Sequence, residues 1–385
     1  MNKKLKILLI VPWYPNPNDK ENPSRGSFFK EQFNNLCMTV DITVLIINIH
    51  YINSSFSFKN FWSLKKRDNK NFSLYELNIF YIPKLLKFTS KYVAFFLSKS
   101  KISTIIENID IIHSHVIFPS GAIGFELAEK FQKPFILTEH ISTFPTLIKN
   151  KYLHKILLNA DYLTAVSSYL KDRILAEGRS QCEVIPNYID TTKYYISSNK
   201  DTKRLQFIHI SSMADIKNVD KLLLGFKLFI EKNDINCKLL LLGGGANVLK
   251  YKNFSKELGI ENVIEFKGDV SNDVLRESLS NSHALLITSI VETFSVVGIE
   301  ALASGVCVIT TKCGGPEDYI EENVTGIYIE SLNVNHISNA LSKYICNQKQ
   351  CNPLKIKQWT YDKFDQSIIV DKLENLYKIM LNYGK

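Results

Sequence analysis

The sequence predicts an α/β protein of two doubly wound domains, each a mostly parallel sheet covered by helices. At 385 residues the chain is too long for one hydrophobic core, so two domains of under roughly 200 residues each are expected. Short apolar runs bounded by turn residues alternate with segments of helical periodicity in both halves, which is typical of βα units. A polar segment rich in Lys, Ser and Thr, residues 191–203, separates the halves.

The N-terminal domain is expected to span residues 1–190. Strands are predicted at residues 7–11, 42–49, 109–113, 135–138 and 162–166. Helices are predicted between them at residues 28–36, 121–131 and 152–159. Residues 184–190 close this domain.

The C-terminal domain is expected to span residues 191–358 and to repeat the same alternation. Its predicted strands are 206–210, 238–242, 263–266, 284–288 and 306–310, and its predicted helices are 219–230, 248–258, 271–280 and 295–304. Residues 359–385 are predicted to form a final amphipathic helix. Two Rossmann-like domains of this kind would face each other across a cleft, with ligands at the carboxyl ends of the strands.

Composition excludes several classes of protein. No apolar run approaches the 18 or so residues that cross a bilayer. The start MNKKLKILLIVPWYP has basic residues and then an apolar run, but the run stops at Pro12 without a cleavage site, so a buried first strand in a cytoplasmic protein is predicted. Seven scattered cysteines without a Cys-x-x-Cys pair indicate reduced thiols rather than a disulfide framework or zinc site.

The net charge of +9 is unevenly distributed. Residues 1–190 carry 24 Lys and Arg against 16 Asp and Glu, giving +8, and the remainder carries 23 against 22, giving +1. The basic half predicts an anionic partner, either a membrane surface or an anionic substrate. Nucleic acid is not expected, because no recognised binding motif accompanies the charge.

Two glutamates, Glu292 and Glu300, lie in an otherwise apolar segment with seven residues between them. Carboxylates in such a segment need polar partners, and the hydroxyls of a sugar or ribose are suitable ones. If a helix begins near Ser295, the amides of its first turn are also available to a phosphate. The alternative is a surface helix with two solvated glutamates, which the apolar neighbours disfavour.

This segment resembles the Glu-x7-Glu signature of the retaining family 4 glycosyltransferases, which have the GT-B fold. Phe294, Gly305 and the run from Gly314 to Glu317 fit the flanking pattern. The resemblance implies that Glu300 binds the nucleotide ribose and that Glu292 holds hydroxyls of the donor sugar. It implies donor binding at Phe294, Ser295, Val296 and Val297, and same-face attack assisted by the leaving phosphate. It also implies that the final helix, residues 359–385, crosses back to the N-terminal domain.

A loop after the first strand of the C-terminal domain carries Lys217. In the family this loop supplies an Arg and, five residues later, a Lys to the donor pyrophosphate; Lys217 matches the Lys, whereas Ser212 occupies the Arg position. Gly243 and Gly244 end the next strand in a turn where backbone can approach a nucleotide. The alternatives are a solvated lysine and an ordinary glycine turn.

In the N-terminal domain, the long loop before residue 28 contains Arg25 and Gly26, which the resemblance places near the distal phosphate or the acceptor. His140 matches a family position near the reacting sugar, so we expect it to bond the donor sugar or the acceptor; a structural histidine is the alternative. No metal site is expected, since no Asp-x-Asp occurs.

Residues 84–102 are predicted to form a helix with lysines on one arc and apolar residues on another. Leu85, Tyr92 and Phe96 are among the apolar arc, whereas Phe88 and Phe95 fall among the lysines. Such a helix either lies in a membrane interface or packs on the core with a solvated lysine face.

The predicted function is transfer of a sugar from a nucleoside diphosphate sugar to a hydroxyl acceptor, with retention and without a metal ion or other cofactor. Glu292, His140 and Lys217 are the predicted catalytic residues. A lipid-linked or surface-polysaccharide acceptor, as in lipopolysaccharide or capsule synthesis, at the inner face of the cytoplasmic membrane fits the basic half. The alternatives are a GT-B epimerase and a catalytically weak membrane partner in polysaccharide assembly, which Ser212 makes conceivable.

Overall fold

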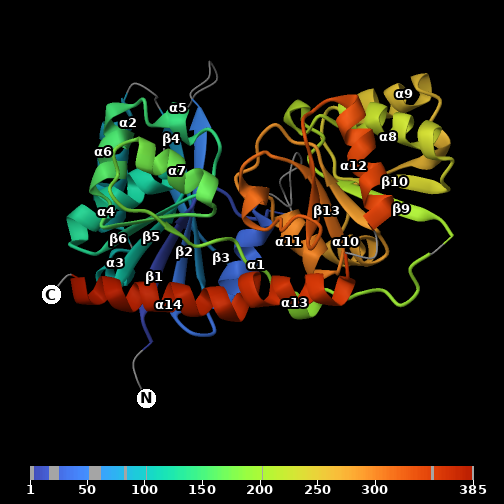
Figure 1. Cartoon of the computed structure of the whole chain (residues 1–385). Helices are drawn as coiled ribbons and strands as arrows, with labels where there is room; N and C mark the ends of the chain where they lie inside the picture. The colour runs from blue at the N-terminus through green and yellow to red at the C-terminus, as the bar shows by residue number, and fades with distance from the viewer. Residues whose placement is uncertain are drawn as a thin grey trace. The chain divides into compact units, whose positions relative to one another are not determined.

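The chain folds into two units, shown as a computed structural model in Figure 1. The structure describes residues 4–16, 26–51, 62–81, 85–100, 102–201, 203–347 and 351–383. The N-terminal unit comprises Met1–Pro186 together with Ile369–Lys385, and the C-terminal unit comprises Asn187–Ile368. Within the described ranges no helix combines the length and the apolar character that a membrane crossing requires.

The N-terminal unit is built on an eight-stranded sheet of order β3-β4-β2-β1-β5-β6-β7-β8. Its strands are β1 Lys6–Val11, β2 Asp41–Tyr51, β3 Trp62–Arg67, β4 Ser73–Tyr81, β5 Ile111–His115, β6 Phe135–Glu139, β7 Tyr162–Ala165 and β8 Glu183–Val184. Ile7 to Val11 are fully buried. A central parallel strand is covered on both faces, which explains why β1 is a continuous apolar run rather than an alternating one.

All neighbouring strands of this sheet are parallel except β3 and β4, which pair antiparallel. This hairpin was not predicted from the sequence. Its edge strand β3 has the sequence WSLKKR. Because three of its six residues are basic, it lacks the apolar pattern on which strand prediction depends.

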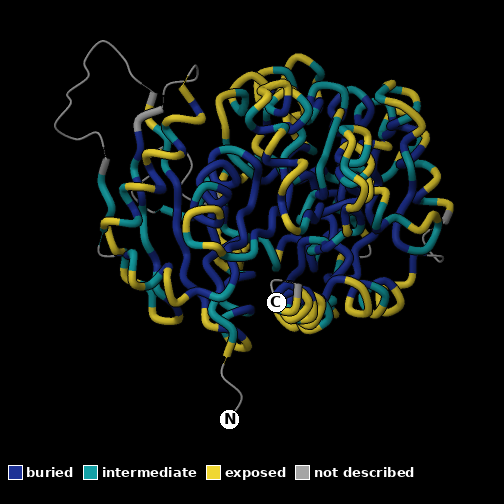
Figure 2. Tube along the Cα trace, turned by 90° about the vertical axis from the view of Figure 1, so that its left-hand side faces the viewer, coloured by how far each residue is buried: buried dark blue, intermediate teal, exposed yellow. Residues whose placement is uncertain are grey.

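Helices cover both faces of the sheet. They are α1 Ser27–Leu36, α2 Leu86–Ser98, α3 Ser103–Glu107, α4 Ala122–Phe131, α5 Phe144–Leu147, α6 Lys151–Asn159 and α7 Ser168–Ala176. Side-chain caps start two of them: Asn150 accepts from the backbone of Tyr152 at 2.9 Å, and Ser167 accepts from Leu170 at 3.3 Å. Figure 2 shows buried strands in dark blue and the solvent-facing turns of the surrounding helices in yellow.

The C-terminal unit contains a parallel six-stranded sheet of order β11-β10-β9-β12-β13-β14. Its strands are β9 Leu205–Ile210, β10 Cys237–Leu242, β11 Ile264–Gly268, β12 Ala284–Ile287, β13 Cys307–Thr311 and β14 Gly326–Ile329. Its helices are α8 Val219–Asn233, α9 Val248–Glu257, α10 Asn272–Ser280, α11 Val296–Ala303, α12 Val334–Asn347 and α13 Pro353–Phe364. The predicted strands and helices of both domains match these elements to within a few residues.

The single helix predicted over residues 359–385 is wrong. Helix α13 ends at Phe364, the next residue, Asp365, is extended (φ −65°, ψ 145°), and α14 Gln366–Tyr383 starts afresh. The Asp365 carboxylate accepts from the backbone of Ser367 at 2.9 Å and from the hydroxyl of Thr191 at 2.5 Å. Aspartate side chains favour such caps over helix interiors. Thr191, expected in a polar linker, is therefore buried in the C-terminal unit.

Each sheet has one point where the strand order reverses. It lies between β1 and β5 in the N-terminal unit and between β9 and β12 in the C-terminal unit. At such a switch point the loops after the two strands diverge to opposite faces and leave a crevice, where doubly wound proteins bind ligands. Ligands are therefore expected beside the residues that follow β5, β9 and β12.

Candidate functional site

Lys217 and Glu292 meet at the switch point of the C-terminal sheet. Lys217 ends a short 3-10 helix after β9, and Glu292 follows β12, the neighbouring strand. Lys217 Nζ lies 2.5 Å from Glu292 Oε1, and the Ser289 hydroxyl donates to the same oxygen at 2.6 Å. Both charged side chains are largely buried, with 21% and 13% of their surfaces exposed. The sequence predicted both residues but neither their contact nor the part of Ser289.

The backbone around Glu292 is fixed by the segment after β13. The Glu292 amide donates to the carbonyl of Cys313, and the Gly315 amide donates to the carbonyl of Glu292, both at 2.8 Å. A Cβ on Gly315 would lie 2.3 Å from the Cα of Phe294, so the two backbones touch. The carboxylate of Glu292 thus stands on a rigid support.

Phe294 was predicted to bind the donor, but its side chain is 1% exposed. Its ring packs edge-on against Tyr319 and Phe364, with centroids 5.7 and 5.8 Å away. Only the backbone of Phe294 remains available to a ligand.

Helix α11 begins directly beyond this turn. Ser295 is left-handed (φ 66°) and has no capping side-chain bond, and Val296 and Val297 form the first turn. The amides of a first turn have no partner within their helix, and they carry the positive end of the helix dipole. This position suits a phosphate, as predicted for residues 295–297.

Glu300 lies one turn further along α11 and is half-buried. Its Oε1 accepts a hydrogen bond from the hydroxyl of Tyr194 at 2.8 Å. Tyr194 is itself 2% exposed, so the carboxylate is held in place by a buried side chain. No motif in the sequence marks Tyr194, which is distant from Glu300 in the chain.

The glycine turn after β10 is built to fit the loop after β9. A Cβ on Gly243, whose φ is 110°, would lie 1.8 Å from the carbonyl oxygen of Ser211. The amide of Gly244 donates to Asp269 Oδ1 at 2.8 Å. Close backbone packing therefore explains Gly243 by itself, and the Gly244 amide is already engaged. Ser212, at the position of the family arginine, is exposed.

His140 lies at the end of β6 in the N-terminal unit, within a cluster of three buried histidines. His140 Nε2 and His115 Nδ1 are 2.9 Å apart. The third, His113, bonds the Tyr377 hydroxyl at 2.9 Å and the Thr138 hydroxyl at 2.7 Å. Burial lowers the pKa of His113 and of His140 to about 3, and burial together with the neighbouring imidazoles lowers the pKa of His115 well below its ordinary value. The three imidazoles are therefore neutral.

Glu139, beside this cluster, is a buried carboxyl with a structural role. It accepts three backbone hydrogen bonds, from Ile117 at 3.0 Å, His140 at 2.8 Å and Ile141 at 2.9 Å. Burial raises its pKa to about 7 against the opposing effect of these donors. It fixes the turn that presents His140.

Gly26 caps α1 in a left-handed conformation with φ 80°, and a Cβ there would lie 2.7 Å from the ring of Trp13. A glycine is therefore required on structural grounds. Arg25 lies outside the described residues.

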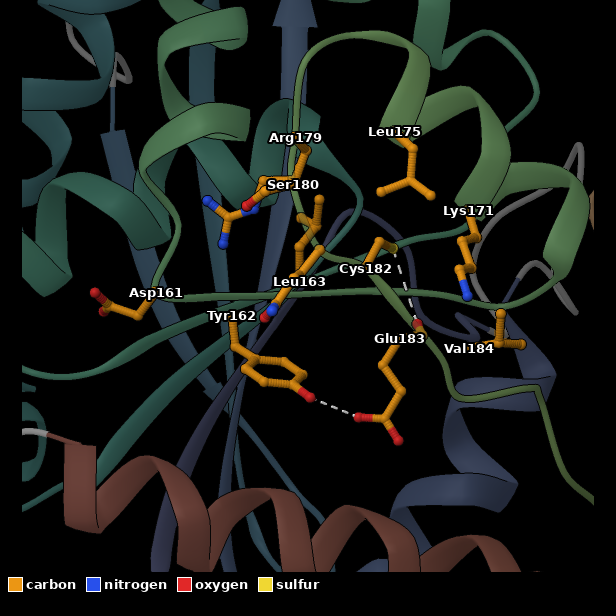
Figure 3. Close-up of a pocket in the computed structure, with 11 residues that line it drawn as sticks. Asp161, Tyr162, Leu163, Lys171, Leu175, Arg179, Ser180, Cys182, Glu183 and Val184 are labelled. Carbon is orange, nitrogen blue, oxygen red and sulfur yellow. Dashed lines mark hydrogen bonds between the residues drawn. The ribbon is translucent and has the colours of Figure 1, made fainter.

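A cavity of about 500 Å³ elsewhere in the N-terminal unit is not part of this site. Figure 3 shows its lining, which includes Lys171, Arg179 and a hydrogen bond of 2.7 Å from the Tyr162 hydroxyl to Glu183. It opens at the amino end of β7, whereas His140 follows the carboxyl end of the adjacent β6.

Similarity to known families decides the class of protein. Residues 190–358 match the family described as Glycosyl transferases group 1, and residues 63–193 match the one described as Glycosyltransferase Family 4. Together the matches span well over half of the chain. The chain belongs to the family 4 glycosyltransferases of GT-B fold. The predicted family and fold class are thereby confirmed, and the protein is a glycosyltransferase.

Similar proteins span most of this glycosyltransferase. An uncharacterized glycosyltransferase of Methanocaldococcus jannaschii is 28% identical over 70% of the chain and 75% of its own length. A lipopolysaccharide 1,6-galactosyltransferase of Escherichia coli is 29% identical over 56% of the chain and 61% of its own length.

Solved structures share the fold. Sucrose-phosphate synthase of Thermosynechococcus elongatus has a TM-score of 0.79 at 16% identity, covering 98% of this chain and 100% of that one. The Anabaena protein HepE, in complex with UDP and glucose, has a TM-score of 0.72 at 15% identity, covering 96% of this chain and 99% of that one.

Proposed function

We propose that this glycosyltransferase moves a sugar from a nucleoside diphosphate sugar to a hydroxyl acceptor with retention of configuration and without a metal ion. The observation that carries this proposal is the contact of Lys217 with Glu292 at the switch point of the C-terminal sheet. Lys217 is a cation that can neutralise a departing diphosphate, and Glu292 is a carboxylate that can bind sugar hydroxyls. The two side chains are in direct contact. The scissile bond joins the diphosphate and the sugar of the donor.

Lys217 supplies the positive charge that the leaving diphosphate requires. Its ammonium is the only charged donor on the Glu292 carboxylate among the described residues, and it leaves that carboxylate when a diphosphate arrives. The amides of Val296 and Val297 add dipolar stabilisation at the start of α11. Because Lys217 provides this charge, the chemistry does not depend on a divalent ion.

Glu292 binds hydroxyls of the donor sugar, and Glu300 binds the ribose. Glu292 is mounted on a rigid backbone, and two donors already share its Oε1, so it is suited to hydrogen bonding rather than to a covalent bond with the sugar. Glu300 lies on α11 beyond Val296 and Val297, where a nucleoside extending from the diphosphate would reach it. His140 binds a hydroxyl of the donor sugar or of the acceptor.

Similar proteins support the substrate classes. HepE is described in complex with UDP-glucose, which supports a nucleoside diphosphate sugar as donor. The similarity to lipopolysaccharide galactosyltransferases supports a surface-polysaccharide acceptor, and such acceptors are amphiphilic.

Helix α2 supports a peripheral position on the inner face of the cytoplasmic membrane. Phe88 is 74% exposed and Phe95 is 52% exposed, and Lys87 and Lys91 are exposed beside them. Tyr92, predicted on the apolar arc, is 55% exposed and widens this aromatic surface. Exposed aromatics flanked by lysines suit the interface of an anionic bilayer.

A thermal-shift screen of nucleoside diphosphate sugars tests the proposed donor class. A ligand at 100 times its dissociation constant adds about 2.7 kcal/mol to the free energy of unfolding, a readily measured shift. NMR of the product formed from the stabilising donor then reads its anomeric configuration. Inversion, or transfer that requires added divalent metal, would contradict the proposal.

A further inference from the structure

His115 is a buried histidine that hydrogen-bonds to His140 and that the proposed reaction does not use. It ends β5 at the switch point of the N-terminal sheet, and His140 follows the adjacent strand β6. Their ring nitrogens, Nδ1 of His115 and Nε2 of His140, are 2.9 Å apart. His115 and His140 are each 8% exposed.

The outer nitrogens of this pair are unusual. Among the residues that the structure describes, Nε2 of His115 and Nδ1 of His140 are buried and have no hydrogen-bond partner. Buried polar atoms are almost always bonded, so such atoms require an explanation. In contrast, both ring nitrogens of the neighbouring His113 are bonded, to Tyr377 and to Thr138.

Aromatic rings surround the pair. The ring of Phe29 meets His115 edge-on at 5.1 Å and His140 edge-on at 5.3 Å, and His113 stacks on His115 at 4.4 Å. This environment disfavours a charged imidazole, so each ring carries one proton. One of the two must then donate the bond between them and the other must accept it.

Only two arrangements of the protons satisfy that bond. If His115 donates from Nδ1, the proton of His140 lies on its outer nitrogen, Nδ1. If His140 donates from Nε2, its Nδ1 keeps an unshared lone pair. The second arrangement puts the proton of each ring on Nε2, which is the tautomer that a neutral histidine side chain prefers in water.

We propose that His115 is a positioning residue that holds His140 in the tautomer protonated on Nε2, so that the lone pair of His140 Nδ1 accepts a hydrogen bond from a substrate hydroxyl. The missing partner of Nδ1 is that hydroxyl, supplied by the donor sugar or the acceptor. The contact of His140 with substrate rests on the proposed function, whereas its tautomer is a property of the free protein.

Three substitutions of His115 separate hydrogen bonding from packing. His115→Asn can place an amide oxygen where Nδ1 was, and that oxygen accepts from His140 Nε2. His115→Gln extends its polar group to the position of the unpartnered Nε2. His115→Leu fills space without any acceptor. Imidazole ¹⁵N NMR of the free enzyme, with His140 assigned through His140→Asn, reports the tautomer, and steady-state kinetics report turnover.

The expected result is a protonated Nε2 and a bare Nδ1 on His140 in the parent and in His115→Asn. His115→Leu and His115→Gln should show mixed tautomers, with turnover lower by about tenfold and KM for the donor little changed. An identical ¹⁵N pattern in His115→Leu, or a parent protonated on Nδ1, would overturn the proposal. Unchanged turnover in His140→Asn would contradict the substrate role of His140 but not the tautomer that His115 imposes on it.

Discussion

The hydroxyl of Tyr194 donates a hydrogen bond to Oε1 of Glu300 at 2.8 Å, although 106 positions separate the two residues. Tyr194 belongs to the segment that enters the C-terminal unit, and Glu300 to a helix beside the switch point. The bond restrains a carboxylate that would otherwise sample several rotamers.

Replacing Glu300 with Ala should weaken nucleoside diphosphate binding by about tenfold or more, because the ribose loses a charged acceptor. Stability should change little, since alanine favours a helix. Tyr194→Phe should weaken binding only a few-fold, because the carboxylate remains but is less well held. Calorimetric titration measures both variants; nucleotide affinity equal to that of the parent in Glu300→Ala would rule out the ribose role.

Replacing Glu292 with Ala should lower turnover by about a hundredfold while nucleoside diphosphate affinity stays equal or rises, because Lys217 is released from its ion pair. Lys217→Ala should instead weaken the nucleoside diphosphate by about 1.5–3 kcal/mol, the range for hydrogen bonds to charged groups. Ser289→Ala, which removes a neutral donor from the same oxygen, is the matched control and should have the smallest effect. Similar losses of nucleotide affinity in the Glu292 and Lys217 variants would contradict this division of roles.

Co-sedimentation with anionic vesicles should fall when Lys87 and Lys91 are changed to Ser, and it should fall with rising salt. Each basic side chain near the surface contributes about 1 kcal/mol. Phe88→Ser should reduce vesicle binding even at low salt, because the contribution of Phe88 to binding is hydrophobic. Lys84, which we also expect to contribute, lies outside the described residues.

The double change of Lys232 and Lys256 to Ser is the control for charge alone. Both lysines are exposed on helices of the C-terminal unit. Equal loss of vesicle binding in the two double variants, or no binding by the parent at low salt, would mean that α2 is not an interfacial helix.

The free energy of unfolding should fall as the pH drops from about 6.5 toward 4. His113 and His140 have folded pKa values of about 3, below the ordinary 6.5, so in this window the unfolded chain binds more protons than the folded one. Each such imidazole lowers the free energy of unfolding by up to about 1.4 kcal/mol for each pH unit that the pH falls. The folded pKa of Glu139 is about 7, so protonation of this carboxyl stabilises the folded protein as the pH falls from about 7 to 4.5. This effect of one group is smaller than the combined opposite effect of His113 and His140.

Urea unfolding at pH 7 and pH 5 measures this slope. His113→Asn should reduce it, because one neutral buried imidazole is gone. Thr138→Val removes a hydrogen bond of His113 but keeps its ring buried, so it should lower stability without changing the slope. A slope that is the same in the parent and in His113→Asn would contradict the prediction.

Strands such as β1 and β12 were predictable from sequence because a strand covered on both faces is a continuous apolar run. The hairpin of β3 and β4 was not, since a charged edge strand lacks that signal. Leu85 and Tyr92 were assigned to the apolar arc of the α2 region, and Leu85 is 44% exposed and Tyr92 is 55% exposed. A long helix with apolar residues on two faces does not reveal from sequence which face meets the core.

The site residues were predictable one at a time but not as contacts. Glu292 and Lys217 stand out through their motifs, yet their ion pair depends on β9 and β12 being neighbours, which only the sheet order determines. Ser289 and Tyr194 belong to no motif. The bond between His115 and His140 likewise requires the register of β5 against β6.

The edge strand β3 also bears on how the protein behaves when concentrated. An unpaired strand edge is a template on which another chain can add by backbone hydrogen bonding. Lys65, Lys66 and Arg67 line this edge in succession, so an approaching copy meets like charge, and the opposite edge, β8, is only two residues long. Within the described residues, both borders of the eight-stranded sheet are therefore poor templates for strand addition, which disfavours edge-to-edge aggregation of the N-terminal unit.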